Sequence, residues 1–298
     1  MMIKDICIAT VAYPQAQPYF LDFVEGLKNT QNVNQLTLVV AEQGVTNIVD
    51  YLNGIDYEIL RIGQDLSIPA VRASLFCYLK NNTNAKYYIF IDIDDRLRSD
   101  GLNFHIETLQ KADFSYGDQN LYKQNFSAPL YQTLFDTMNA PEKLTSLDDL
   151  SNGNCVGLSA FGLKDSTLAH MPENIPDDLI AVDWFIARKL LENGLKGKKT
   201  QGCVNDYRLS DPGLGRLMSA KTKEEWKNRA KIALAHFRAV EDETRIKGVQ
   251  ILLNSLEKEP DFILKHAKEV LPQKIFWYED VSIMALYLCN NKNEVITQ

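Results

Sequence analysis

The chain has 298 residues, of which 45% are hydrophobic and 24% charged, so it is long enough for one large globular domain or two smaller ones. Its net charge of −7 gives no indication of a nucleic-acid-binding surface. The five cysteines are widely spaced and form no CxxC pair, which argues against a disulfide framework and a zinc site. No signal peptide is evident, and no apolar run approaches the roughly 20 residues of a membrane span. We expect a cytoplasmic protein, either fully soluble or peripherally attached to the inner face of the membrane.

Short apolar segments alternate with amphipathic ones through the first part of the chain. Apolar residues spaced at i, i+3, i+4 and i+7 predict a helix near 20–27, and an apolar face of Ile68, Val71, Leu75 and Tyr78 predicts another near 68–78. The segments between them are β-branched or aromatic and too short for independent helices, so they predict strands. These strands lie at 6–11, 36–40, 57–62 and 87–91. Short strands separated by helices form the βαβ pattern, so we expect an α/β fold with a mostly parallel central sheet flanked by helices.

The strand at 87–91 runs directly into three carboxylates, Asp92, Asp94 and Asp95. If the backbone stays extended, its period of two places Asp92 and Asp94 on one face and Asp95 on the other. Open α/β sheets bind ligands at the carboxyl ends of their strands. Two carboxylates on one face favour a hard cation, Mg²⁺ or Mn²⁺, with phosphate oxygens completing its coordination. The alternative is a solvated turn in which Asp caps the next helix.

The pattern is less regular from residue 101 onward. The sequence predicts a helix at 104–109, strands at 114–118 and 155–161, and a helix at 183–193. The long stretch 121–148 is expected to be a lid or an acceptor-side loop.

Helical periodicity returns in the last part of the chain, where an apolar stripe begins at Trp226. We expect an α/β domain over residues 1–220 and an α-helical extension over residues 221–298 packed on it. A Trp at helical spacing is more often a core residue than part of a cofactor site, so no chemistry is assigned to the extension.

The order of these features resembles the nucleotide-sugar-dependent glycosyltransferases with a GT-A fold, most closely family 2. The similar segments are the opening ATVAYPQAQPYFLDFVEGL, the strand LTLVVAEQGVTN, the helix IPAVRASLFCYLKNN, the strand YYIFIDIDD, which resembles the DxD metal motif, and the stretch 154–194, which holds an Asp-Trp pair. The resemblance spans roughly residues 3–210.

This resemblance implies roles for individual residues. The residues that would contact the nucleotide sugar are Ala12, Glu42, Arg72 and Asp92. The residues that would hold Mn²⁺ or Mg²⁺ are Asp94 and Asp92, with Asp95 in an accessory role. For Arg72, the alternative is an ordinary solvated charge on a helix.

Asp183, at the start of the predicted helix 183–193, is implied as the base that deprotonates the acceptor hydroxyl. The positive end of the helix dipole is expected to keep its carboxylate ionised. The alternative is that Asp183 only caps the helix.

Three residues depart from the family pattern. Glu42 stands where Asp is usual, Val182 replaces the Glu that commonly precedes the Asp-Trp pair, and Asp211 lies where a His often appears.

The resulting expectation is a metal-dependent enzyme that moves a sugar from a nucleotide diphosphate of the uridine type to a hydroxyl of a glycan or lipid-linked acceptor, with inversion and an Asp base. Two alternatives remain open. One is a sugar nucleotidyltransferase, although the glycine-rich loop usual in that class is missing after the first strand. The other is a catalytically inactive module that binds nucleotides or glycans, for which Val182 is the best support.

Overall fold

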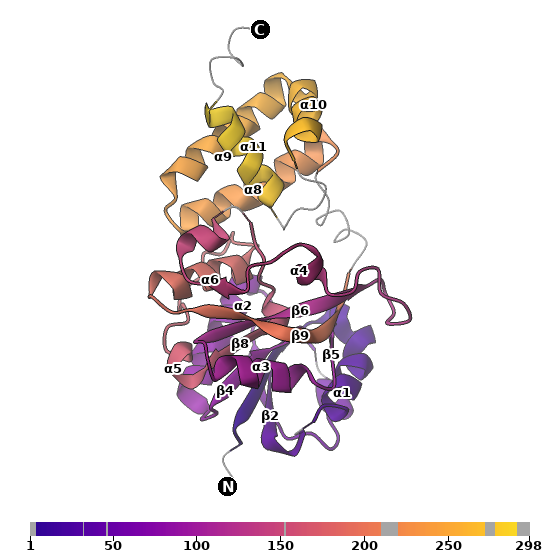
Figure 1. The fold of residues 1–298 in the computed structure, drawn as a ribbon. Coiled ribbons are helices and arrows are strands. Elements are labelled where there is room, and N and C mark those ends of the chain that lie inside the picture. The colour runs from indigo at the N-terminus through magenta and orange to yellow at the C-terminus, as the bar shows by residue number, and fades with distance from the viewer. Residues whose placement is uncertain are drawn as a thin grey trace.

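Nine strands form one sheet in the computed structural model, which describes residues 4–31, 33–45, 47–151, 153–209, 220–271 and 278–290 (Figure 1). The strand order is β3-β2-β1-β4-β8-β6-β9-β5, and the short β7 pairs with β9 beside this path. The strands are β1 Ile6–Ala12, β2 Leu36–Gln43, β3 Tyr57–Ile62, β4 Tyr87–Phe90, β5 Arg96–Leu97, β6 Phe114–Tyr122, β7 Lys143–Leu144, β8 Phe161–Lys164 and β9 Gly197–Arg208.

The first half of the sheet is parallel. β1 lies between β2 and β4 and runs parallel to both, and β3 runs parallel to β2. Every residue of β1 is buried, as expected for a strand that is covered on both faces. The four strands predicted for this half are therefore confirmed, and with them the helix-flanked α/β architecture.

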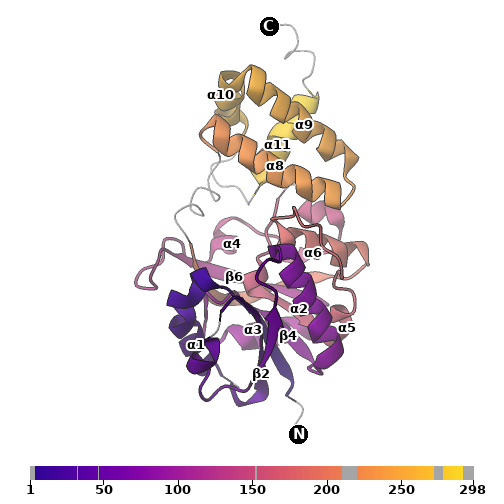
Figure 2. The same ribbon diagram turned by 180° about the vertical axis from the view of Figure 1, so that it is seen from behind.

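Helices cover both faces of the sheet. Ile6 and Ile8 of β1 pack in one core with α1 and α3, whereas Cys7 and Ala9 pack in the other core with α2, as the alternation of side chains along a strand requires. Accordingly, α3 faces the viewer in Figure 1 and α2 in Figure 2. The helices of this part are α1 Phe20–Lys28, α2 Ile68–Asn82, α3 Gly101–Leu109, α4 Leu134–Thr137, α5 Asp165–Leu168 and α6 Val182–Glu192.

Helix α2 begins where its sequence indicates. The Ser67 hydroxyl accepts a hydrogen bond from the Ala70 N–H at 3.3 Å, and Pro69 lies in the first turn, where its missing N–H costs nothing. The predicted apolar face is only partly right, because Ile68 is 69% exposed while Phe76 is fully buried.

The second half of the sheet differs from the prediction. The strand predicted at 155–161 is wrong, because Leu158–Ala160 forms a 3₁₀ turn and β8 begins only at Phe161. β8 pairs antiparallel with both β4 and β6. The twelve-residue β9 was not predicted, since polar residues and two glycines obscure any apolar alternation in GKKTQGCVNDYR.

Within the described residues, the helices that follow the sheet are α8 Lys223–Ala239, α9 Glu243–Lys258, α10 Pro260–Val270 and α11 Glu279–Asn290. α8 starts with a capping box in which Thr222 and Glu225 each bind the other's backbone N–H. The stripe that begins at Trp226 is buried, as predicted. α9 and α11 approach closely at Gly248, where a Cβ would lie 3.1 Å from Ala285.

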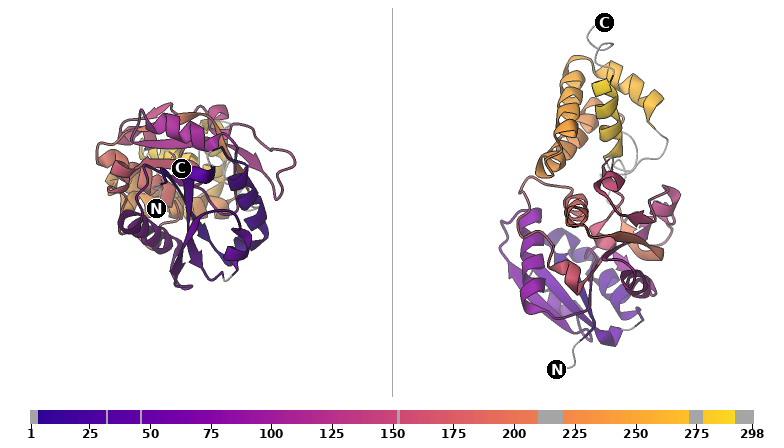
Figure 3. Two further views of the ribbon diagram at one scale, coloured as in Figure 1. Left: turned by 90° about the horizontal axis from the view of Figure 1, so that it is seen from below. Right: turned by 60° about the vertical axis from the view of Figure 1, so that its left-hand side comes forward.

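The four C-terminal helices sit at one end of the α/β part, where α6 contacts α8 (Figure 3). Residues 210–219, which join β9 to this region, lie outside the described residues. The domain boundary at residues 220 and 221 therefore stays a prediction.

Candidate active site

The three carboxylates after β4 lie on a turn and not on an extended strand. β4 ends at Phe90, and the Asp95 N–H donates to the Asp92 carbonyl at 3.0 Å. The expectation of an extended backbone past Ile91 is thus wrong. The turn nonetheless separates the carboxylates, because Asp92 and Asp94 are partly exposed whereas Asp95 is buried.

The buried Asp95 carboxylate is hydrogen-bonded to other residues of the chain. Its carboxylate accepts hydrogen bonds from the Arg208 N–H at 2.7 Å, from the Ser159 hydroxyl and, at 3.5 Å, from the Asn205 amide. Burial, followed by the charges of Asp94 and Asp92, raises its pKa well above the usual value. A 1% exposed carboxylate with these partners anchors the turn to β9 and to the 3₁₀ turn at Ser159, so direct contact with a substrate is not its role.

Asp92 and Asp94 face the space above the sheet edge. Asp92 forms an ion pair with Arg72 of α2, and the Tyr13 hydroxyl binds Asp94. Burial and then the charge of Asp92 raise the pKa of Asp94 to about 6. A cation bound between the two side chains would offset the repulsion that raises the pKa of Asp94.

The donor set fits a divalent cation only in part. Among the described residues, no three His, Cys, Asp or Glu side chains come together in a way that could hold a metal ion. Mg²⁺ is commonly bound through one or two carboxylates together with substrate phosphates. The pair of Asp92 and Asp94 suits that mode, and a cation bound there would depend on oxygens from a ligand.

Ala12 and Glu42 lie at the same edge of the sheet. They are directly paired residues at the ends of the parallel strands β1 and β2. The Ala12 side chain is fully buried, so only its backbone could meet a ligand, whereas Glu42 is partly exposed.

Asp183 lies in the first turn of α6, one residue after its first residue, Val182. Its carboxylate accepts the Trp184 N–H at 2.8 Å and binds the side chain of Asn154. Asp183 is not the N-cap, which is Ala181. Burial outweighs these hydrogen bonds and raises its pKa to about 6, so the carboxyl is ionised above that pH.

The charge of Asp92 contributes to the raised pKa of Asp183. Asp183 therefore lies within electrostatic reach of the carboxylate turn, although the two are far apart in the sequence. The pKa of Tyr207 in β9 is raised by burial and then by the charges of Asp95, Asp92, Asp94 and Asp183. Tyr207 is therefore within electrostatic reach of both the carboxylate turn and Asp183.

Sequence reasoning missed several residues of this site. Arg208 is the largest omission: its Nε donates to the Asp94 carbonyl at 2.9 Å, and its Nη2 binds Asp22 at 2.5 Å. Ser159 and Tyr13 were missed as well. Tyr207 and Arg208 end β9, which was not predicted, so no local signal pointed to Arg208.

Asp211 lies outside the described residues, so its departure from the family pattern stays a prediction. No helix in the described part of the chain has the length and apolar character of a membrane span.

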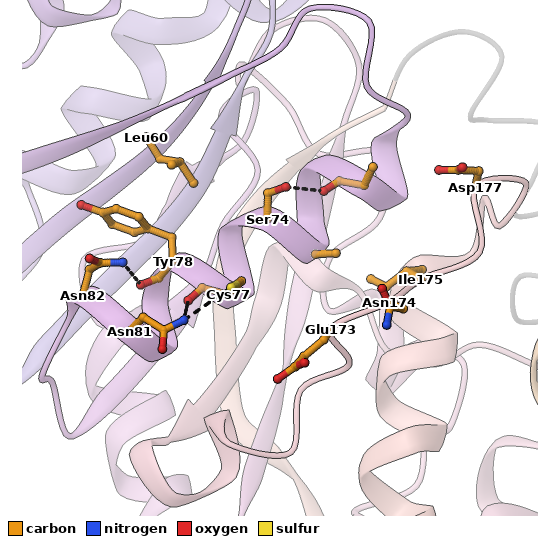
Figure 4. Close-up of a pocket in the computed structure, with 12 residues that line it drawn as sticks. Leu60, Ser74, Cys77, Tyr78, Asn81, Asn82, Glu173, Asn174, Ile175 and Asp177 are labelled. Carbon is orange, nitrogen blue, oxygen red and sulfur yellow. Dashed lines mark hydrogen bonds between the residues drawn. The ribbon is translucent and has the colours of Figure 1, made fainter.

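A groove of about 650 Å³ lies elsewhere, between the outer face of α2 and residues 173–177 (Figure 4). It contains none of the carboxylates described above. Asn81 and Asn82, at one end, donate to carbonyls of their own helix. The groove is thus separate from the acidic edge of the sheet.

Searches of the sequence against protein-family models and curated proteins found no match. Solved structures are nevertheless similar. Residues 1–349 of S. aureus TarS, in complex with UDP-GlcNAc, align over 85% of this chain and 72% of that chain, with a TM-score of 0.53 and 12% identity. The mannosyltransferase PcManGT from Pyrobaculum calidifontis, in complex with GDP-Man and Mn²⁺, aligns over 81% of this chain and 65% of that chain, with a TM-score of 0.56 and 12% identity.

The chain therefore has a glycosyltransferase fold. It is the GT-A-like fold that the sequence predicted, with the acidic turn at the edge of the sheet. A longer structure of TarS aligns over 78% of this chain but only 43% of that chain, with a TM-score of 0.51, so this chain spans less than half of that length.

Proposed function

We propose that this protein is a glycosyltransferase that moves a sugar from a nucleotide diphosphate, of the uridine type, to a hydroxyl of a glycan or lipid-linked acceptor. The observation that carries the proposal is that the charge of Asp92 in the carboxylate turn contributes to the raised pKa of Asp183. The similarity to structures bound to UDP-GlcNAc and to GDP-Man with Mn²⁺ supports the donor class.

On this proposal, the donor occupies the edge formed by β1, β2 and β4. Glu42 and the Ala12 backbone contact the nucleoside, since they are paired at the strand ends. Arg72 binds a phosphate: its Nη1 is buried without a hydrogen-bond partner among the described residues, so it has a donor to offer. Asp94 and Asp92 hold Mn²⁺ or Mg²⁺, which supplies positive charge against the departing diphosphate.

Asp183 acts as the general base. The acceptor oxygen forms a bond to C1 of the sugar while the bond from C1 to the phosphate oxygen breaks. The acceptor proton moves to the Asp183 carboxylate, and the electron pair of the broken bond remains on the diphosphate. Attack from the side opposite the leaving group inverts the configuration at C1. A pKa of about 6 suits a base that works near neutral pH.

A second function is favoured by one observation. Val182, which stands where the family commonly has Glu, is a buried residue of α6 and offers no carboxylate. An inactive module that binds nucleotides or glycans would tolerate this loss.

Calorimetry with UDP and with GDP, with and without Mn²⁺, tests the donor site. We expect binding that requires Mn²⁺ and is tighter for UDP. Transfer or hydrolysis is then followed as release of the nucleoside diphosphate from UDP- and GDP-linked sugars. Metal-dependent binding without turnover would favour the inactive module, and metal-independent binding or none would contradict the proposed donor site.

A further inference from the structure

The indole of Trp184 is enclosed by aromatic side chains of the C-terminal helices. The His236 ring of α8 stacks on it with centroids 3.7 Å apart and planes 8° apart. Phe237 meets it edge-on at 5.4 Å, and Tyr278, just before α11, lies parallel to it at 6.1 Å. These three residues, His236, Phe237 and Tyr278, are called the aromatic clamp below.

Trp184 is also hydrogen-bonded to Asp183 through its backbone. Its backbone N–H donates to the Asp183 carboxylate at 2.8 Å, and its indole N–H donates to the Leu150 carbonyl at 2.8 Å. Trp184 is fully buried, so its ring cannot shift without moving the first turn of α6. The orientation of Asp183 is thereby connected to helices that lie outside the sheet.

The ring of His236 contacts Trp184 by stacking and not by a hydrogen bond. The side chain is fully buried, and neither ring nitrogen has a hydrogen-bond partner among the described residues. A buried imidazole without hydrogen bonds destabilises a core relative to an apolar side chain of the same shape. The flat ring and its stacking geometry are the properties by which this side chain can act on Trp184.

We propose that His236 is a positioning residue for Asp183. The aromatic clamp fixes Trp184, Trp184 fixes the first turn of α6, and the carboxylate of Asp183 is thereby held toward the acceptor. The C-terminal helices are thus a working part of the site. This inference rests on the proposed role of Asp183 as the base.

Two substitutions separate the flat ring from mere bulk. His236→Leu fills the core but cannot stack, whereas His236→Phe keeps a flat ring. We expect the Leu variant to lose about tenfold to 100-fold in kcat, since a displacement of about 1 Å can cost that much. The KM for the nucleotide sugar and the Kd for UDP with Mn²⁺ should stay within about twofold, because the donor edge is untouched. His236→Phe should retain kcat within about threefold.

A matched control exists in the same region. His266 of α10 packs on Phe262 with centroids 3.9 Å apart, but it belongs to a stack that does not include Trp184. His266→Leu should leave kcat unchanged. Thermal melting shows whether His236→Leu, His236→Phe and His266→Leu are folded. If His236→Leu is unfolded, the kcat of His236→Phe still tests the inference.

Release of nucleoside diphosphate from UDP-GlcNAc and from GDP-mannose with Mn²⁺ is measured for each variant and for Asp183→Asn. A kcat of His236→Leu equal to that of His266→Leu, or a loss in His236→Phe as large as that in His236→Leu, would overturn the inference. If Asp183→Asn is inactive while His236→Leu is fully active, the role of Asp183 as the base is supported and only the positioning role of His236 is rejected. If Asp183→Asn is fully active, the proposed base and the inference that rests on it both fail.

Discussion

Buried polar groups are hydrogen-bonded at the acidic edge of the sheet, whereas several at the junction between α6 and α8 have no partner among the described residues. At the acidic edge, buried Asp95 and Arg208 are tied to each other, to Ser159 and to backbone groups. At the junction, neither ring nitrogen of His236 nor the Nε and Nη1 of Arg188 has a hydrogen-bond partner among the described residues. Hydrogen bonds therefore fix the position of groups at the first region, whereas packing shape does so at the second.

Asp183 connects the two regions. The charge of Asp92 at the acidic edge contributes to its raised pKa, and its helix, α6, forms one side of the junction. Substitutions at the acidic edge should change either the nucleotide affinity or the kcat. Substitution of a buried side chain that hydrogen-bonds Asp95 should instead lower the free energy of unfolding.

The largest expected effect is that of Asp183→Asn on transfer. The amide can still accept the Trp184 N–H, but it cannot take a proton from the acceptor. Loss of a general base costs about 10²–10⁴-fold, so we expect kcat to fall within that range. Steady-state turnover and calorimetry with UDP and Mn²⁺ check this, and the nucleotide affinity should be unchanged. Normal turnover in this variant would remove Asp183 from the mechanism.

The next effect is that of Asp94→Ala on nucleotide binding. Removal of one of the two proposed metal ligands should weaken the Mn²⁺-dependent binding of UDP about tenfold to 100-fold, by analogy with losses in other metal sites. Calorimetry with and without Mn²⁺ measures it. Affinity equal to that of the unsubstituted protein would show that Asp94 is not a ligand.

Ser159→Ala should act mainly on stability. The Ser159 hydroxyl donates to Asp95 and accepts the Asp92 N–H at 3.1 Å, so its loss leaves buried groups unsatisfied. We expect the free energy of unfolding to fall by about 2 kcal/mol. Urea denaturation provides the measurement, with Ser127→Ala at an exposed position as a control for Ser-to-Ala exchange. Equal values for the two variants would contradict the anchoring role given to Asp95.

The acid limb of the pH profile should follow Asp183. Its pKa is raised to about 6, so the carboxyl is protonated and inactive below that pH and ionised above it. The kcat should therefore fall about fivefold between pH 6 and pH 5, and about tenfold for each further pH unit. The control is the Kd for UDP, which is measured at the same pH values to separate donor binding from catalysis. A kcat that is flat down to pH 5 would argue against this base.

The smallest effect is the pH dependence of stability at the same residue. Because the folded-state pKa of Asp183 lies above the ordinary 3.8, its contribution favours the folded state at low pH and is lost as pH rises through about 6. Asp183→Asn should therefore be more stable than the unsubstituted protein at pH 8, by on the order of 1 kcal/mol, but not at pH 4. Thermal melting at both pH values distinguishes this from a uniform shift.

Much of the fold could be predicted because its first half obeys simple periodicity. β1 and β4 are apolar on both faces, and α1 repeats its apolar residues at helical spacing. β9 escaped prediction because its residues are fixed by partners from distant parts of the chain, such as Arg96 on Asp206 at 2.7 Å. A strand whose polar side chains are satisfied by tertiary contacts carries no local signal.

The site was predictable to the extent that its chemistry lies in one segment. Asp92 and Asp94 were found from their position after a buried strand, whereas the role of Asp183 came from resemblance. The burial of Asp95 could not be foreseen, because it depends on Ser159 and Arg208. The raised pKa of Asp183 could not be foreseen for a similar reason, because it results from desolvation by the surrounding fold.

The ion pair between Arg72 and Asp92 has a thermodynamic consequence. In the absence of ligand, the guanidinium neutralises a carboxylate that the proposed cation would also use. A cation at Asp92 would release Arg72 toward a diphosphate, and a diphosphate that draws Arg72 away would leave Asp92 free for a cation. Each ligand should therefore increase the affinity for the other by the same factor, as linkage requires. Arg72→Gln should reduce this cooperativity between Mn²⁺ and UDP, so a single side chain would set how strictly the nucleotide and the metal arrive together.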